Sequence, residues 1–326
     1  MPSIGVVLGA GGVVGAAYHA GVLTALAEAG FDARLADLIV GTSAGSAVGA
    51  TVRAGFPPAD LAARSLGRPI SEAARAIVGD VAGPPTLDLR PRPFSRSPVP
   101  ASPKLLLRAA RRPTAALAGL LPVGTVETEV IGERITAMYG DRRWPEQSLW
   151  ICAVDLEHGE RVVFGRDSAE APIGTAVRAS SSIPGFFRPV AHAGRRYVDG
   201  AVHSPTNADL LAGHGLDIVV IVSPMSATRI AHGALLPNTR PIHARRLAGE
   251  VERIRASGTQ VLTFQPTPEV VAAMGRNAMD ATRRAPTTHA ALESARARLA
   301  DGQVADRLDL LRRAVPDPDH RDRCAD

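Results

Sequence analysis

DLIVGTSAGSAVGATV, residues 37–52, is the stretch that decides the fold. Its apolar beginning, Asp37–Val40, predicts a short buried strand, and its small residues after Ser43 predict a tightly packed helix. Between them Gly41-Thr42-Ser43-Ala44-Gly45 fits the pattern Gly-x-Ser-x-Gly, which places the serine hydroxyl in the open on a sharp strand-to-helix turn. The glycines Gly41 and Gly45 keep that turn free of bulk. The alternative is an ordinary glycine-rich turn whose serine caps the helix.

An earlier segment repeats the same arrangement. Ile4–Leu8 predicts a strand, Gly9–Gly15 a glycine turn and Ala16–Ala29 a helix, and two such units in a row are typical of a parallel sheet covered by helices. The residues from Ile4 to Ala27 carry no Asp, Glu, Lys or Arg, as a membrane span would. Because no basic residue precedes Arg34 and glycines interrupt the run, we interpret it as buried structure and not as a signal peptide or anchor.

The glycine turn is expected to lie near Ser43, since the carboxyl ends of parallel strands meet at one edge of the sheet. Backbone N–H groups of Gly11 and Gly12, together with that of Ala44, would then stabilise an oxyanion, and losing one such donor costs roughly 3–4 kcal/mol. A dinucleotide-binding loop is the alternative. The spacing argues against it, because Ala10 stands where the first glycine of that pattern belongs and no ribose-binding acid follows a second strand.

A serine nucleophile needs a base, and the chain offers two kinds. Asp199 follows an apolar strand end in Tyr197-Val198-Asp199-Gly200-Ala201, where burial would raise its pKa and make it a better base. Taken alone, Asp199-Gly200 is also compatible with an ordinary turn. A Ser-His-Asp triad through His192, His203 or His214 stays open, although none of these histidines sits in a recognisable motif.

The remaining chain divides by composition. Nine prolines between Pro84 and Pro122 predict an insertion at about residues 81–125 with no part in the sheet. Inside it Leu105–Leu107 stand among four basic residues, which predicts either a solvated helix packed on the core or a patch that enters a membrane interface. Further helices are predicted at Glu127–Met138, at Ala171–Ser181 and in most of the chain after Arg240, and further strands at Leu149–Leu156, Arg161–Phe164, Arg195–Val198, Asp217–Val222 and Gln260–Phe264.

The amino-acid composition indicates which kinds of binding partner are compatible with this chain. The 326 residues are 45% hydrophobic and 4% aromatic, and their net charge of +5 is scattered along the chain. Few stacking aromatics and no basic stripe argue against nucleic acid, whereas contact with an anionic membrane surface stays compatible. Cys152 and Cys324 suggest neither a disulfide framework nor a metal cluster, so we expect a cytoplasmic protein, with peripheral membrane contact as an option; the oligomeric state stays open.

Four blocks in this order resemble the patatin-like phospholipase family. They are the glycine loop Leu8–Gly15 with the helix start after it, the Gly41–Gly45 turn, Arg178–Pro189, and Tyr197–Ala201 followed by Asn207 and Asp209.

The resemblance implies a three-layer α/β/α patatin-like fold with a mainly parallel central sheet. It implies a Ser43–Asp199 dyad that cleaves acyl esters of phospholipids or related lipids without a metal or other cofactor. The resemblance spans about residues 4–222, and we expect a core of residues 1–224. Beyond it the sequence itself predicts that helical residues 225–314 complete the same domain and that the Pro/Asp/Arg-rich tail at 315–326 is disordered. Two positions depart from the family pattern: Val14 stands in place of a basic residue and Ala10 in place of a glycine. The Val14 substitution motivates the alternative, a catalytically weak lipid-binding or regulatory protein of the same fold.

Overall fold

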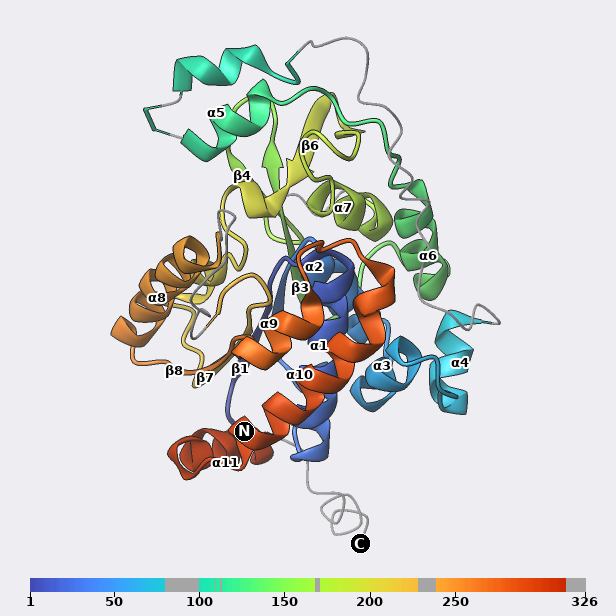
Figure 1. Cartoon of the computed structure of the whole chain (residues 1–326), viewed down its shortest axis with the longest axis vertical. Coiled ribbons are helices and arrows are strands. Elements are labelled where there is room, and N and C mark those ends of the chain that lie inside the picture. The colour runs from blue at the N-terminus through green and yellow to red at the C-terminus, as the bar shows by residue number, and fades with distance from the viewer. Residues whose placement is uncertain (80–99, 109, 112, 168–170, 228–238, 315–326) are drawn as a thin grey trace, which may run out of the picture.

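The structure is a computed structural model that describes residues 1–79, 100–108, 110–111, 113–167, 171–227 and 239–314 (Figure 1). Within these residues eight strands form one sheet in the order β5-β6-β3-β2-β1-β7-β8, and β4 pairs with β3 off this path. The strands are β1 (Ile4–Leu8), β2 (Leu38–Thr42), β3 (Ser148–Asp155), β4 (Arg161–Phe164), β5 (Val190–His192), β6 (Arg195–Asp199), β7 (Ile218–Val222) and β8 (Gln260–Phe264).

Five adjacent strands, from β3 to the edge strand β8, run parallel, and the other three pair antiparallel. β1 pairs with β2 on one side and β7 on the other, β3 continues the parallel set beyond β2, and β8 continues it beyond β7. β4 and β6 pair antiparallel to β3, and β5 pairs antiparallel to β6. The fold class is thus confirmed: a mainly parallel sheet lies between helices.

Helices cover both faces of the sheet. The principal helices are α1 (Gly12–Glu28), α2 (Ala44–Arg53), α3 (Pro58–Ser65), α4 (Glu72–Val78), α5 (Pro113–Leu120), α6 (Glu129–Tyr139), α7 (Ile173–Ser180), α8 (Arg240–Ala256), α9 (Pro268–Met274), α10 (Arg284–Leu299) and α11 (Ala305–Arg312). Short 3₁₀ turns that matter below are η1 (Ala33–Leu35), η2 (Pro103–Arg108), η3 (Gly200–Val202) and η4 (Ala208–Leu211).

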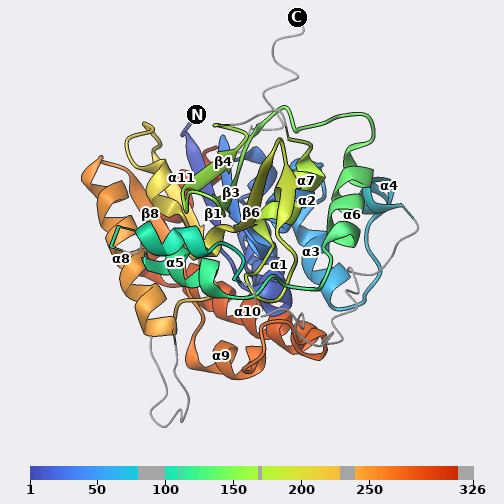
Figure 2. The same cartoon turned by 90° about the horizontal axis from the view of Figure 1, so that it is seen from above.

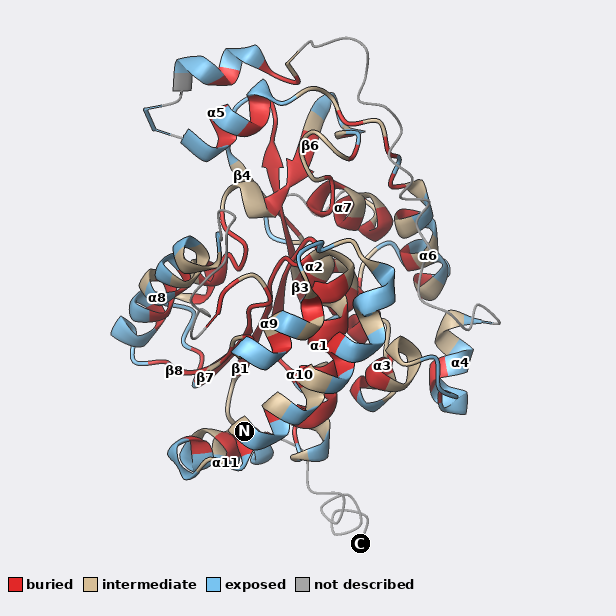
Figure 3. Ribbon diagram, viewed as in Figure 1, coloured by how far each residue is buried: buried red, intermediate tan, exposed pale blue. Residues whose placement is uncertain are grey.

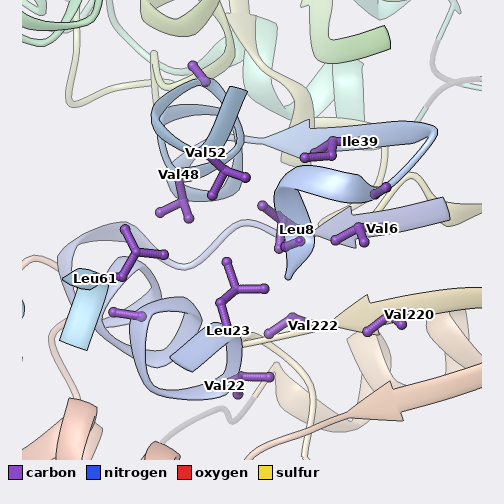
Figure 4. Packing of buried hydrophobic residues seen from close by; sticks show 14 of the residues in the cluster. Val6, Leu8, Val22, Leu23, Ile39, Val48, Val52, Leu61, Val220 and Val222 are labelled. Atoms are coloured by element: carbon purple, nitrogen blue, oxygen red, sulfur yellow. The ribbon is translucent and has the colours of Figure 1, made fainter. Parts of the chain in front are cut away.

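Alternating strand residues divide the core into two layers. Val6 and Leu8 of β1 pack with α1, α2 and α10 on one face, whereas Val7 packs on the other face with α8 and the segment around η4. Figure 2 shows α8 on one side of the strands and α2, α3 and α6 on the opposite side. In Figure 4, Leu8 and Ile39 of the strands face Val48 and Val52 of α2, so apolar packing holds the helix that follows Ser43. Because helices bury both faces of the sheet, the fold has three layers.

The predicted strands at Ile4–Leu8, Arg161–Phe164 and Gln260–Phe264 have the observed bounds, and the other predicted strands differ by one or two residues. The predicted helix start at Ala16 is wrong, because α1 begins inside the glycine turn at Gly12. β5, α3 and α4 were not predicted, since β5 has only three residues and the two helices are short.

The Pro-rich insertion is described only in part. Residues 80–99, 109 and 112 and the predicted tail 315–326 lie outside the described residues, as does Cys324, and the rest of the insertion contains η2 and α5 and no strand. Cys152 is a buried free thiol in β3. Among the described residues, no helix has both the length and the apolar character needed to cross a membrane. The proposed division at residues 224 and 314 stays a prediction.

Candidate active site

Ser43 lies between the end of β2 and the start of α2, in a backbone conformation that non-glycine residues seldom adopt. Its φ is 53° and its ψ is −121°. Such a conformation costs about 1–3 kcal/mol and persists where the surroundings enforce it. Here the Ser43 N–H donates to Oγ of Ser180 at 2.8 Å, and its carbonyl accepts from Oγ of Ser46 at 2.6 Å. Ser180 in turn donates to the Cys152 carbonyl at 2.7 Å, which ties the turn to β3.

The glycines beside Ser43 are required by close backbone contacts. A Cβ atom at Gly45 would lie 1.9 Å from the carbonyl oxygen of Leu8, and one at Gly41 would lie 2.6 Å from Cα of Ser46. Both distances are far inside van der Waals contact. The Gly-x-Ser-x-Gly pattern therefore reflects how tightly α2 is packed against the ends of β1 and β2.

Asp199 ends β6 and is brought beside Ser43 by the sheet order. β6 pairs with β3, and β3 pairs with β2, so Asp199 and Ser43 come from nearby strands although they are distant in sequence. Ser43 and Asp199 line the same cavity, and the Ser43 hydroxyl favours the charged form of the Asp199 carboxylate, as does the Ala201 N–H, which donates to Oδ1 at 2.8 Å. Gly200 allows the following turn to pass close to β3, since a Cβ there would lie 2.3 Å from the Cys152 carbonyl oxygen.

Burial sets the electrostatics of this carboxylate. Asp199 is 3% exposed and Ser43 is 4% exposed. Removal from water raises the pKa of Asp199 from 3.8 to about 6, although the hydrogen bonds from Ser43 and Ala201 partly oppose the rise. A carboxylate with this pKa is charged at neutral pH and accepts a proton more readily than an exposed one.

Gly11 and Gly12 of the glycine loop line the same cavity as Asp199. Gly12 has a φ of +62°, and a Cβ there would lie 2.7 Å from the Ala278 carbonyl oxygen, so glycine is needed for both reasons. Within the described chain, no protein acceptor takes the N–H of Gly11, Gly12 or Ala44. Ala44 begins α2 and is not among the residues that line the cavity.

The other two glycines of the loop fix its position. The Gly9 N–H donates to the Val222 carbonyl at 2.9 Å, and its own carbonyl bonds Nε2 of His19 at 2.7 Å. The Gly15 N–H donates to the Gly11 carbonyl at 2.9 Å, which closes the first turn of α1. These contacts anchor the loop at both ends.

The cavity at this edge of the sheet has a volume of about 820 Å³. Its walls are mainly apolar, and two arginines, Arg240 and Arg276, also line it. Val14, which departs from the family pattern, contributes to the apolar wall, and its N–H donates to the Ala278 carbonyl at 3.1 Å. The other apolar lining residues are Ala10, Ile183, Pro184, Ala201, Val202, Pro224, Met225, Val271, Met274 and Ala278.

The patatin-like phospholipase model matches residues 6–212, which is more than half of the chain. The chain belongs to the patatin-like phospholipase family. Family membership supports a lipid acyl hydrolase. The matched residues include the glycine loop, the serine turn and Asp199.

Two solved structures are similar to this patatin-like chain. VipD from Legionella pneumophila is 14% identical over 91% of this chain and 66% of its own, with a TM-score of 0.39. The type III effector protein ExoU is 16% identical over 92% of this chain and 54% of its own, with a TM-score of 0.35. The chain thus spans under two thirds of the first and about half of the second.

No histidine is among the described residues that line the cavity. His192 lies in β5, His203 follows η3, and His214 stacks edge-on against Trp150 with ring centroids 5.1 Å apart. His19 is buried in α1, and burial lowers its pKa to about 4, so its neutral ring donates to the Gly9 carbonyl. His19 is thus a buried core residue and does not line the cavity.

A buried polar network behind the site contains residues that sequence reasoning missed. Glu250 of α8 accepts hydrogen bonds from the hydroxyl groups of Ser204 and Thr206, which lie in the loop after η3. Asn207 of the same loop donates to Oγ1 of Thr42 at 3.1 Å, next to the serine turn. No local motif marks Glu250, because its role depends on α8 packing against that loop.

The C-terminal part of the cavity was also missed. Arg240, Val271 and Arg276 lie beyond the family match, and no pattern in the sequence distinguishes them. Arg240 is held in the wall by hydrogen bonds to the carbonyls of Pro224 and Ser226 at 2.7 and 3.0 Å. The segment predicted only as helical completion therefore closes the site.

Proposed function

We propose that this chain hydrolyses acyl esters of lipids, with Ser43 as the nucleophile and Asp199 as the general base. The observation that carries the proposal is that the two buried side chains meet in one mainly apolar cavity, whose described lining includes no histidine. With no imidazole in that lining, the carboxylate would take the hydroxyl proton directly.

The reaction would run in two halves. Asp199 takes the proton as Oγ of Ser43 bonds to the ester carbonyl carbon, and the carbonyl electrons move onto oxygen. When this tetrahedral oxyanion collapses, the bond to the alkoxy oxygen breaks, the alcohol leaves with the proton from Asp199, and the acyl group stays on Ser43. A water molecule then repeats the sequence, losing its proton to Asp199, and releases the fatty acid and the serine.

Backbone donors are suited to the oxyanion. Gly11 and Gly12 line the same cavity as Ser43 and carry no side chain that would obstruct a substrate oxygen. The Ala44 N–H, at the start of α2, would add the positive end of a helix dipole. The apolar walls of the cavity are suited to an acyl chain, which supports a lipid ester as the substrate.

The decisive experiment compares Ser43→Ala with the unmodified protein on p-nitrophenyl butyrate. We expect turnover to fall by at least about a thousandfold. Ser65→Ala is the matched control, because Ser65 lies on α3 and its hydroxyl contacts Thr288, away from the cavity. Equal turnover by Ser43→Ala and the unmodified protein would refute the nucleophile, and a fluorophosphonate probe should label only variants that retain Ser43.

A second comparison separates the dyad from a triad. Asp199→Asn should lose activity, whereas alanine substitutions at His192, His203 and His214 should each keep it within about threefold, since general-base loss costs roughly 10²–10⁴-fold. A collapse of activity at one histidine would favour the triad. If the unmodified protein shows no turnover but retains lipid, the catalytically weak alternative replaces the proposal.

A further inference from the structure

Helix α5 buries its small residues and exposes its large apolar side chains. Ala115, Ala116, Ala118 and Gly119 are buried, whereas Leu117 is 65% exposed. Leu120, three positions after Leu117, is exposed on the same face of α5, and Leu121, which directly follows the helix, is exposed as well. An ordinary surface helix does the opposite and turns its large apolar residues inward. Figure 3 shows exposed and buried residues alternating along α5.

The neighbouring turn η2 adds two more exposed leucines. Leu105 is buried against β3 and β6, so the predicted packing of this leucine run on the core holds for its first member only. Leu106 is exposed, and Leu107 is 91% exposed. Five of the nine large hydrophobic side chains exposed in the described chain thus lie between Leu106 and Leu121, which we call the leucine cap.

The outward orientation of the leucine cap is fixed by backbone contacts. A Cβ at Gly119 would lie 2.6 Å from the Ser102 carbonyl oxygen and 3.0 Å from the Leu105 side chain, so α5 and η2 touch along their small residues. The Ala101 N–H donates to the Leu121 carbonyl, and the Ser102 N–H donates to the Gly119 carbonyl, both at 2.9 Å. The exposed leucines therefore cannot turn inward without breaking this contact.

The leucine cap adjoins the cavity that contains Ser43. Val202 lines that cavity and also packs against the cluster that buries Leu105. The Leu121 side chain lies 3.5 Å from the Cβ position of Gly185, next to Pro184 of the cavity wall. In Figure 1, α5 lies at one end of the molecule, close to β6, whose last residue is Asp199.

Charge indicates which partner covers these leucines. Residues 100–126 contain four basic residues and no acidic one, and Lys104 and Arg111 are exposed. Apolar side chains beside basic ones are suited to an anionic lipid surface, where the leucines enter the acyl boundary and the cations stay among the headgroups. A protein partner would need acidic groups around an apolar pocket, whereas an anionic bilayer offers both properties over any area.

We propose that the leucine cap is a docking surface for an anionic membrane and brings the lipid to the adjacent cavity. This inference rests on the proposed function in one respect: the membrane to which the leucine cap docks supplies the acyl ester. Docking itself is independent of hydrolysis and is measured separately.

The test is cosedimentation with vesicles of phosphatidylglycerol and phosphatidylcholine in equal amounts, using Ser43→Ala so that the vesicles stay intact. Adding Leu107→Asp and Leu117→Asp should weaken vesicle binding by at least about tenfold, because two apolar anchors become charged. Leu35→Asp is the matched control: Leu35 is 39% exposed in η1, at the opposite end of β2 from Ser43, and its replacement should leave binding unchanged. Charge reversal at Lys104 and Arg111 should reduce binding to these vesicles but not to phosphatidylcholine alone.

Unchanged vesicle binding by Leu107→Asp with Leu117→Asp would overturn the proposal. So would a stable dimer of the parent that the same pair dissociates without affecting vesicle binding, since the leucines would then contact a second copy. With Ser43 present, the pair should retain turnover of soluble p-nitrophenyl butyrate, which shows that the fold survives. Failure of the unmodified protein to hydrolyse that ester would count against the proposed function and leave the vesicle result to decide docking.

Discussion

Replacing Asp199 by asparagine should make the protein more stable while it removes activity. In the folded protein burial raises the pKa of Asp199 from 3.8 to about 6, whereas the unfolded chain retains the lower value. Between these two values the unfolded state loses its proton first, so stability falls as pH rises through this window. Above pH 6 the charged carboxylate is present in both states, and the cost of burying it is complete.

The magnitude follows from linkage. The rise from 3.8 to about 6 corresponds to about 3 kcal/mol at pH 7.5, to roughly half of that at pH 5 and to less than about 1 kcal/mol at pH 4. Asparagine carries no charge and keeps a similar shape, so Asp199→Asn should exceed the unmodified protein in stability by these amounts. The gain should vanish in acid, where the native carboxyl is also neutral.

Urea denaturation at these three pH values measures the free energies of unfolding. Asp209→Asn is the control of opposite sign: burial alone would raise the pKa of Asp209, but its ion pair with Arg161 holds that pKa below the ordinary value. Its stabilising contribution is present at neutral pH and is lost as pH falls, so this variant should be destabilised at pH 7.5. A stability gain for Asp199→Asn that does not depend on pH, or a loss at pH 7.5, would contradict the reasoning.

Three further outcomes are expected. First, kcat/KM for p-nitrophenyl butyrate should rise about tenfold between pH 5 and pH 7 and then level off, as a base with a pKa of about 6 requires; a profile still rising at pH 8 would point to another group. Second, Gly45→Ala should lower the free energy of unfolding by about 3 kcal/mol or more, because its Cβ would collide with the Leu8 carbonyl. Gly249→Ala in α8, where a Cβ meets nothing within 4 Å, should instead raise it by about 0.5–1 kcal/mol in the same melts. Third, Ser180→Ala should cost about 1–3 kcal/mol and lower kcat more than it raises KM, because Ser180 positions the serine turn; a change in KM alone would refute this role.

Local patterns in the sequence were sufficient to predict the core of the fold. Short β-branched runs, glycines at fixed spacing and small residues after Ser43 act over a few positions, so they predicted β1, β2, β7, β8 and the turn at Gly41–Gly45. The motif also indicated the glycine at position 45, although its cause is a tertiary contact: the crowding comes from the Leu8 carbonyl at the end of β1. The family resemblance added Asp199, which composition and periodicity alone would have left as an ordinary turn.

Only the tertiary structure decided which distant groups share a cavity. The pairing of β6 with β3 brings Asp199 to Ser43, and burial there shifts its pKa, a property that no neighbour in sequence encodes. Arg276 joins the wall, and Leu117 of α5 faces outward, because of how helices pack and not because of any motif. Sequence patterns report contacts between near neighbours, whereas the shape and charge of a cavity or a surface depend on side chains from segments that meet only when the chain folds.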